Sequence, residues 1–401
     1  MTSTSAESLS HHSATRILTT HVGSLVRPDA LVAFLRLQDE GRPFDTAAFN
    51  ECLRSSVRDV VNKQIEIGLD VINDGEFGKT ISWSRYVLER LNGFEQRDRQ
   101  PGMPPATIGK DHRDFADFYR EYDATQGFTR MRGWAVTGPI EYTGFAALQR
   151  DIDDLKAAAA GAPVAGLFMT AVAPCSVAPD RKDEYYHDDE AYLFAIAAAV
   201  REEYKAIVEA GLTLQVDDAY FATTYDRMVP PGTLKDYRAW AELRVAALNH
   251  ALRDIPEDRS RYHVCWGSWN APHVSDVPLR EIVDLILQVR VGGYALEMAN
   301  PRHEHEWQVW KDFKLPAGRI LLPGVVTHST NVVEHPALVA ERITRLAHLV
   351  GRENVIGSTD CGFAQGPFVR RVHPSIMWAK LQALVEGARL ASRKLWGRAA
   401  A

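Results

Sequence analysis

The chain has 401 residues, of which 46% are hydrophobic, a formal net charge of -6 and a pI near 6.2. This charge excludes the basic surface of nucleic-acid-binding proteins, and no apolar run approaches the roughly 18 residues that a membrane helix needs. Four cysteines are too few for a disulfide framework in so long a chain, so a reducing cytoplasm is the expected compartment. The expected partners are small molecules, with a homo-oligomer left open.

The first 15 residues are predicted to be disordered. Ser, Thr and His are frequent in this stretch, which lacks the apolar core of a secretory signal. A single catalytic domain is expected to span residues 16–395.

Eight short apolar runs, each ending in polar or small residues, follow one another along this domain. They lie at 17–22, 70–73, 166–172, 212–216, 262–266, 294–298, 319–326 and 354–358. The stretches between them have apolar spacing of about 3.6 residues, as in 189–210, which stops at Gly211 as a helix C-cap would. Strands and helices that alternate in this way favour an α/β fold, a parallel sheet closed into a (β/α)8 TIM barrel. In that fold, reactive groups gather where the strands end.

The interval between the second and third runs is too long for one helix. It contains four residues that interrupt helices, Pro101, Gly102, Pro104 and Pro105, and a charged stretch follows at 110–123. We therefore expect residues 94–160 to form an excursion from the barrel after its second strand. The shift in composition is too mild to mark a separate domain.

Three predicted strand ends carry the four donor atoms of a zinc site. His263 and Cys265 stand two residues apart in one strand, so both point to the same face. Glu297 and Cys361 close or follow two other runs, and one nitrogen, two thiolates and a carboxylate can complete a tetrahedral zinc shell. A thiolate-rich zinc of this kind lowers the pKa of a substrate thiol. Glu297 is the least certain of the four ligands from spacing. Without the other two residues, the His-x-Cys pair would also fit a buried strand in which the histidine is hydrogen-bonded and the cysteine packs as a small apolar residue.

Other strand ends have more than one interpretation. Glu76 and Asp217 lie where a carboxylate commonly caps a helix, but at the barrel mouth they could bind a substrate ammonium or hold a metal ligand in place. His328 fits a general acid that protonates a leaving group, or a simple loop hydrogen bond. His303 and His305 alternate with carboxylates, where a solvated loop or a rim contact to substrate is favoured over a second metal site.

Six motifs occur in the order found in the catalytic domain of cobalamin-independent methionine synthase, which the chain resembles from about residue 16 to 385. They are THVGS at 20–24, GLDVINDGE at 68–76, LQVDD at 214–218, HVC at 263–265, PGVVTHS at 323–329 and TDCG at 359–362. The resemblance implies a (β/α)8 barrel whose zinc is held by His263, Cys265, Glu297 and Cys361.

The same resemblance implies roles for four more residues. Ser24 and Glu76 would contact the amino-acid part of homocysteine, Asp217 would bind its ammonium, and His328 would assist proton transfer to the departing folate. The chain lacks the second, N-terminal half of the full-length synthase, so a polyglutamylated folate could not be held in the same manner. The expected activity is thus zinc-dependent S-alkyl transfer, first of all methyl transfer from a methyl-folate donor to the thiol of homocysteine.

Two rival functions stay open. Short relatives of the synthase include epoxyalkane:coenzyme M transferases, which open an epoxide with a zinc thiolate. The sulfonate of coenzyme M requires a cationic partner, which Arg27, Lys79, Arg85 or Arg302 could supply. A zinc-free barrel of the uroporphyrinogen decarboxylase type would need cations at its mouth and would not need the two cysteines.

Overall fold

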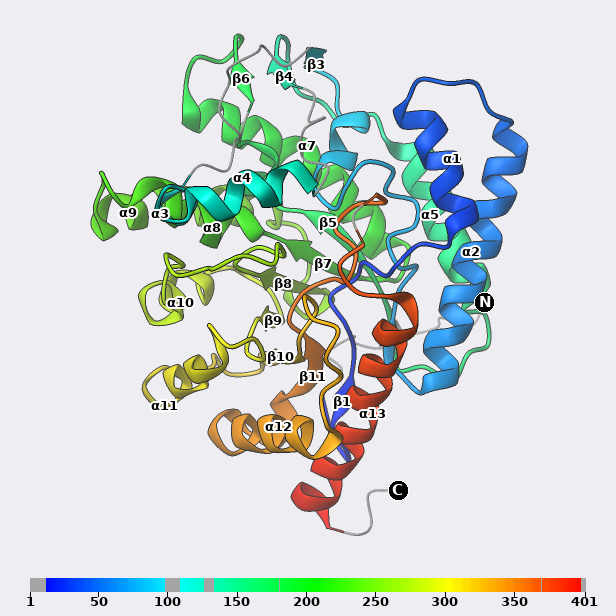
Figure 1. Ribbon diagram of the computed structural model, residues 1–401, viewed down its shortest axis with the longest axis vertical. Coiled ribbons are helices and arrows are strands. Elements are labelled where there is room, and N and C mark those ends of the chain that lie inside the picture. Colours follow the sequence, from blue (N-terminus) through cyan, green and yellow to red (C-terminus); the bar gives the residue numbers. More distant parts are fainter. Residues whose placement is uncertain (1–11, 98–108, 126–132, 180, 369, 398–401) are drawn as a thin grey trace.

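The predicted (β/α)8 barrel is confirmed by the structure, a computed structural model that describes residues 12–97, 109–125, 133–179, 181–368 and 370–397. Eight parallel strands form one sheet in the order β1-β11-β10-β9-β8-β7-β5-β2, and all of them except β2 are labelled in Figure 1. They are β1 Leu18–Thr19, β2 Val71–Ile72, β5 Gly166–Val172, β7 Thr213–Asp217, β8 Ser260–Val264, β9 Gly293–Leu296, β10 Ile320–Val326 and β11 Ile356–Thr359. Each overlaps one of the eight predicted runs, although β8 begins and ends two residues before the run predicted at 262–266.

The first and last strands of that order, β1 and β2, meet and close the barrel. The backbone N–H of Asp70 donates to the Thr19 carbonyl at 3.1 Å, and the Thr20 hydroxyl donates to the Val71 carbonyl at 2.8 Å. The strands are buried on both sides, which explains why they read as continuous apolar runs.

An outer layer of helices covers the sheet. Its longer members are α1 Asp29–Asp39, α2 Thr46–Ile67, α5 Phe145–Ala158, α7 Asp189–Glu209, α8 Ala219–Met228, α9 Leu234–Ala251, α12 Pro336–Val350 and α13 Pro374–Trp396. Shorter elements are α6 Pro174–Val177, α10 Val283–Ile286, α11 Val309–Asp312 and the 3-10 turns η1 Arg85–Glu89, η3 Glu257–Arg259, η4 Leu279–Glu281, η5 Glu304–Gln308 and η6 Arg352–Asn354.

Helix α7 shows how the sequence sets these boundaries. It begins at the Asp188 side chain, which accepts the N–H of Ala191, and it ends before Gly211, whose φ of +88° few other residues adopt. Its buried face includes Leu193, Ile196 and Val200, and each such side chain contributes about 1.5–3 kcal/mol through burial.

The predicted excursion supplies two of the three strands of a second, small sheet, seen at the top of Figure 1, and the third strand lies outside its limits of 94–160. Its strands are β3 Phe94–Arg97, β4 Gly133–Val136 and β6 Lys182–Asp183, with β4 antiparallel to β3 and parallel to β6. Helices α3 Lys110–Asp114 and α4 Ala116–Thr125 follow β3. Helix α5, which also falls within the predicted limits of 94–160, packs against α2 in the outer layer of the barrel. Residues 98–108 and 126–132 lie outside the described part of the chain.

Contacts with the barrel begin before residue 16. Ser13 is buried, and its hydroxyl donates to the Val355 carbonyl at 2.6 Å. The predicted disorder of residues 1–11 concerns a segment outside the described residues and stays a prediction. Within the described ranges, no helix is both long enough and apolar enough to cross a membrane.

Candidate functional site

The carboxyl ends of the barrel strands surround a cavity of about 670 Å³. Six of the eight predicted site residues line it: Ser24, Glu76, Asp217, His263, Cys265 and Cys361. They come from loops after β1, β2 and β11 and from the ends of β7 and β8, far apart in sequence. The barrel therefore brings these residues together, as expected for groups that follow parallel strands.

A histidine and two cysteines form one cluster in this wall. One donor atom from each of His263, Cys265 and Cys361 lies within 4.8 Å of the other two, and the two sulfurs are 3.6 Å apart. The hydrogen bond between the thiols lowers the pKa of Cys361 well below its ordinary value and raises that of Cys265. His263 Nδ1 donates to the Ala295 carbonyl at 3.2 Å, which leaves the lone pair on Nε2.

Glu297 and His328 form a second cluster that shares Cys361. Their donor atoms and the Cys361 sulfur lie within 4.8 Å of one another. Asn300 donates its amide to Glu297 Oε2 at 2.8 Å, so Oε1 is the carboxylate oxygen left for another partner. Burial raises the pKa of Glu297 well above its ordinary value and lowers that of His328 to about 4. Neither residue is among those that line the cavity.

These two clusters fit a metal ion. Among the described residues, four buried polar atoms here have no hydrogen-bond partner: His263 Nε2, Glu297 Oε1 and both ring nitrogens of His328. An unpartnered buried polar atom costs about 1–3 kcal/mol, so a cation that several of them coordinate would remove a considerable penalty. Imidazole nitrogen, thiolate sulfur and carboxylate oxygen are the donors that zinc takes.

Two carboxylates occupy another part of the wall, and neither caps a helix. Glu76 has a φ of +61°, directly after Gly75, and its Oε1 accepts the Thr170 hydroxyl at 2.8 Å. Lys79 Nζ lies 3.5 Å from the same oxygen.

Asp217 ends β7 and accepts the Gln215 amide at 2.7 Å. Burial raises the pKa of Asp217 to about 7. Ser24 Oγ accepts the N–H of Ala364 at 3.3 Å and is held against Gly362, where a Cβ would lie 2.0 Å from that oxygen.

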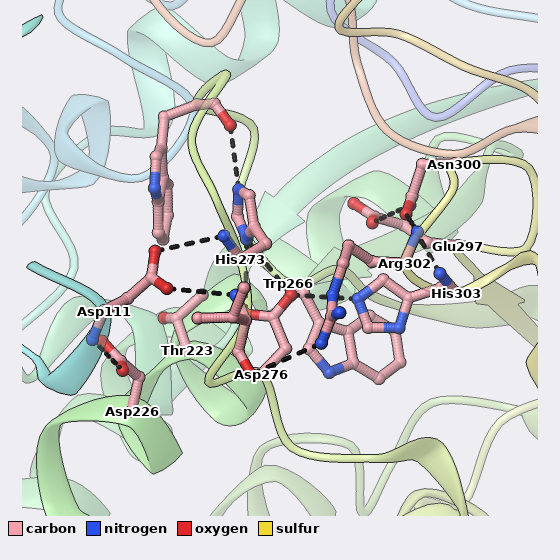
Figure 2. Close-up of polar contacts among 12 residues, drawn as sticks. Asp111, Thr223, Asp226, Trp266, His273, Asp276, Glu297, Asn300, Arg302 and His303 are labelled. Atoms are coloured by element: carbon pink, nitrogen blue, oxygen red, sulfur yellow. Dashed lines mark hydrogen bonds and ion pairs between the residues drawn. The ribbon is translucent and has the colours of Figure 1, made fainter. Parts of the chain in front are cut away.

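The structure corrects the expectation for His303, which neither contacts solvent nor lines the cavity. Its ring lies beside that of Trp266 (Figure 2), with the ring centroids 4.3 Å apart. The ring nitrogens bridge Asp276 and Glu306. His305 is exposed and also absent from the cavity wall.

Several contacts at the site were not anticipated from the sequence. Ser268 donates its hydroxyl to the Cys361 sulfur at 3.0 Å, and Asn300 fixes Glu297. Asp360 Oδ1 accepts the N–H groups of Met298 and Ala299, which ties the end of β9 to the residue before Cys361. Asp360 lies in the TDCG motif at 359–362. Ser268 and Asn300 reach their partners through the conformation of loops, which no residue spacing in the sequence indicates.

The comparisons with known proteins concern nearly the whole chain. It is 27% identical over 375 residues to the uncharacterized protein YxjH of Bacillus subtilis, covering 91% of this chain and 92% of that protein. It is 24% identical over 383 residues to a protein named methionine synthase from Saccharolobus solfataricus, covering 94% and 95%. No protein-family model matches the chain.

A solved structure shares the fold. It is a B12-independent methionine synthase from a Shewanella species, determined in complex with selenomethionine, with a TM-score of 0.68 and 17% identity. The superposition covers 95% of this chain and 99% of that one. At this identity the likeness shows the fold alone.

Proposed function

We propose that the chain, which is similar over nearly its whole length to a protein named methionine synthase, transfers a methyl group to the thiol of homocysteine. The observation that carries this proposal is the cluster of His263, Cys265 and Cys361 in the cavity wall. Cysteine and histidine side chains that converge on one point at the mouth of a barrel suit a thiol substrate, which needs activation by a soft Lewis acid.

We propose zinc as the metal, held by His263, Cys265, Glu297 and Cys361. When bound, zinc would lower the pKa of the substrate thiol so that a thiolate is present at neutral pH. The protein's own contribution begins with the fixed ligands. The Ala295 carbonyl orients His263, and Asn300 orients Glu297, so both offer a free donor atom.

The carboxylates Glu76 and Asp217 are proposed to bind the substrate ammonium. Thr170 and Lys79 hold Glu76 Oε1, while Gln215 holds Asp217, so neither carboxylate has to be reordered when a ligand arrives. Ser24 would contact the amino-acid part beside them. These contacts orient the thiol toward the two cysteines, and such orientation is a large share of the catalysis in a transfer between two substrates.

His328 is proposed to assist proton transfer to the departing carrier. Burial lowers its pKa to about 4, so the ring is neutral at pH 7 and offers one N–H. Its place beside Cys361, behind the cavity wall, supports action close to the metal centre. The His328 ring would have to move toward the cavity before it could contact the methyl donor.

The donor proposed is a methyl-folate. Trp83, Tyr122 and Trp269 line the same cavity and offer aromatic faces for a planar carrier. All four cysteines are free, and thiolate ligands persist in a reducing compartment, which supports a cytoplasmic site of action.

Three of the four cations considered for a sulfonate thiol do not line the cavity. Arg27 donates to the Glu76 and Lys79 carbonyls, Lys79 faces Glu76, and Arg302 is exposed on another loop. Of the four cations considered for coenzyme M, Arg85 alone lines the cavity. A barrel that works without metal would leave the buried donor atoms around Cys361 unpaired, which disfavours the decarboxylase type.

A paired assay tests the proposal. Zinc-loaded protein is incubated with 5-methyltetrahydrofolate and homocysteine, and in parallel with an epoxide and coenzyme M, and products are identified by mass spectrometry. We expect methionine in the first reaction, lost in Cys265→Ser and retained in Cys52→Ser, whose thiol lies outside the cavity wall. Product from coenzyme M alone, or methionine at the same rate from Cys265→Ser, would contradict the proposal.

A further inference from the structure

We propose that Ser268 is a positioning residue of the metal centre: its hydroxyl holds the Cys361 sulfur and withdraws charge from it. This inference rests on the proposed metal centre at Cys265 and Cys361. The observation behind it is an O–H···S contact of 3.0 Å between a serine in the loop after β8 and a cysteine in the loop after β11. Ser268 is 7% exposed and lines the cavity next to both cysteines.

A sharp turn brings this hydroxyl to the sulfur. Gly267 has a φ of +95°, and a Cβ on it would lie 1.9 Å from the Trp269 ring. A residue with a side chain would face both backbone strain and this clash. The turn sends Ser268 back across the cavity wall to Cys361, while Trp269 enters the cavity.

The start of the loop is fastened to the barrel independently of any metal. Trp266 donates its indole N–H to the Val277 carbonyl at 2.7 Å, which draws the two ends of the loop together. The Trp266 ring lies against His303, and His303 in turn binds Asp276 at 3.1 Å.

The far side of the loop is fastened to helix α3 by one carboxylate, Asp111. It accepts the N–H groups of His273 and Val274 at 3.1 and 3.0 Å. Figure 2 shows Asp111 facing His273. His273 in turn closes the loop by a hydrogen bond to the Trp269 carbonyl at 2.9 Å. The position of the Ser268 hydroxyl is therefore built into the fold, as positioning of a ligand requires.

The contact has a definite electronic consequence. Two thiolates and a carboxylate would give the proposed centre more negative charge than a divalent ion can neutralise. A hydroxyl donating to one thiolate offsets part of that excess and lowers the energy of the sulfur lone pairs. Removing the donor should make Cys361 a more electron-rich ligand and leave it less firmly placed.

Cobalt(II) gives a readout that is independent of catalysis, because thiolate ligands produce a charge-transfer band in the near ultraviolet. The full-length protein is loaded with cobalt as wild type, Ser268→Ala, Ser268→Thr and Ser392→Ala. Ser392 is a matched control, since its buried hydroxyl donates to the Ala388 carbonyl away from the cavity wall. Cobalt affinity is measured in the same samples by competition with a chelator.

We expect the band of Ser268→Ala to move to longer wavelength and its cobalt affinity to fall roughly 10-fold, the usual effect of losing an outer hydrogen bond to a ligand. Ser268→Thr, which keeps the hydroxyl, should restore the wild-type band, and Ser392→Ala should match wild type. If the wild type shows the band but Ser268→Ala changes neither its wavelength nor the cobalt affinity, this inference alone is overturned. A wild type without any thiolate band would overturn the metal centre and this inference with it.

Discussion

The charge on His303 provides a prediction that depends on the fold and not on the proposed chemistry. Its Nδ1 lies 2.8 Å from Glu306 Oε2 and its Nε2 lies 3.1 Å from Asp276 Oδ2. Both ring nitrogens face carboxylates, so both must carry protons. Burial opposes the charge, but the hydrogen bonds to Asp276 and Glu306 prevail and raise the pKa of His303 to about 9.

The size of the effect follows from that value. A histidine whose pKa rises from about 6.5 in the unfolded chain to about 9 in the folded one stabilises the fold by about 3 kcal/mol. Because the folded pKa is the higher one, this stabilisation is complete below pH 6.5. It declines as the pH rises and is lost above about pH 9.

The assay is urea unfolding of the metal-free, reduced protein at about pH 6, 8 and 10, chosen to bracket both pKa values. The variant His303→Gln cannot carry the charge, so the gap in unfolding free energy between wild type and variant should narrow by about 3 kcal/mol across this range. His305→Gln, at an exposed position two residues away, should show no such narrowing. A gap for His303→Gln that stays constant from pH 6 to 10 would refute the reasoning.

Three other predictions concern the cavity. Gly267→Ala should lower the unfolding free energy by about 1–3 kcal/mol, because the alanine would strain the backbone and clash with Trp269. Gly318→Ala, also at positive φ but with open space around it, should lower the unfolding free energy less. An equal loss for both variants in urea unfolding would contradict a special role for the turn at Gly267. Homocysteine should bind more tightly as the pH rises through about 7, because Asp217 ionises there and its charge attracts the ammonium group. The des-amino analogue 4-mercaptobutanoate should show no matching change. Parallel pH profiles of the two ligands in calorimetry would contradict the role of Asp217 in ammonium binding. Cys175→Ala should retain all bound metal, because this thiol is buried outside the cavity wall, and metal loss in that variant would reassign the ligands.

The barrel could be predicted because its strands are buried on both faces and end in polar residues. Such strands give continuous apolar runs, and all eight were located from that pattern alone. Cys265 and Cys361 were then placed together because parallel strands in a barrel end on the same side. The small sheet gave no such signal, since β3 (Phe94–Arg97) is mostly exposed and charged, and β6 pairs with β4 from a distant part of the chain.

The contacts that refine the site could not be predicted in the same way. Ser268 reaches Cys361 because Gly267 turns the loop, and Asp111 fixes that loop from an excursion more than 150 residues earlier. His303 looked like a solvated loop residue because its sequence neighbours are charged. Its burial depends on Trp266, which comes from a different strand end.

Metal analysis combined with zinc X-ray absorption tests the central claim most directly. Protein purified without added metal should hold about one zinc per chain, with sulfur and lighter atoms around it as the His263, Cys265, Glu297 and Cys361 donor set requires. Adding homocysteine should increase the sulfur contribution to the spectrum, and Cys265→Ser should lose most of the metal. Protein that holds little zinc, or a Cys265→Ser variant that keeps it with an unchanged spectrum, would contradict the account.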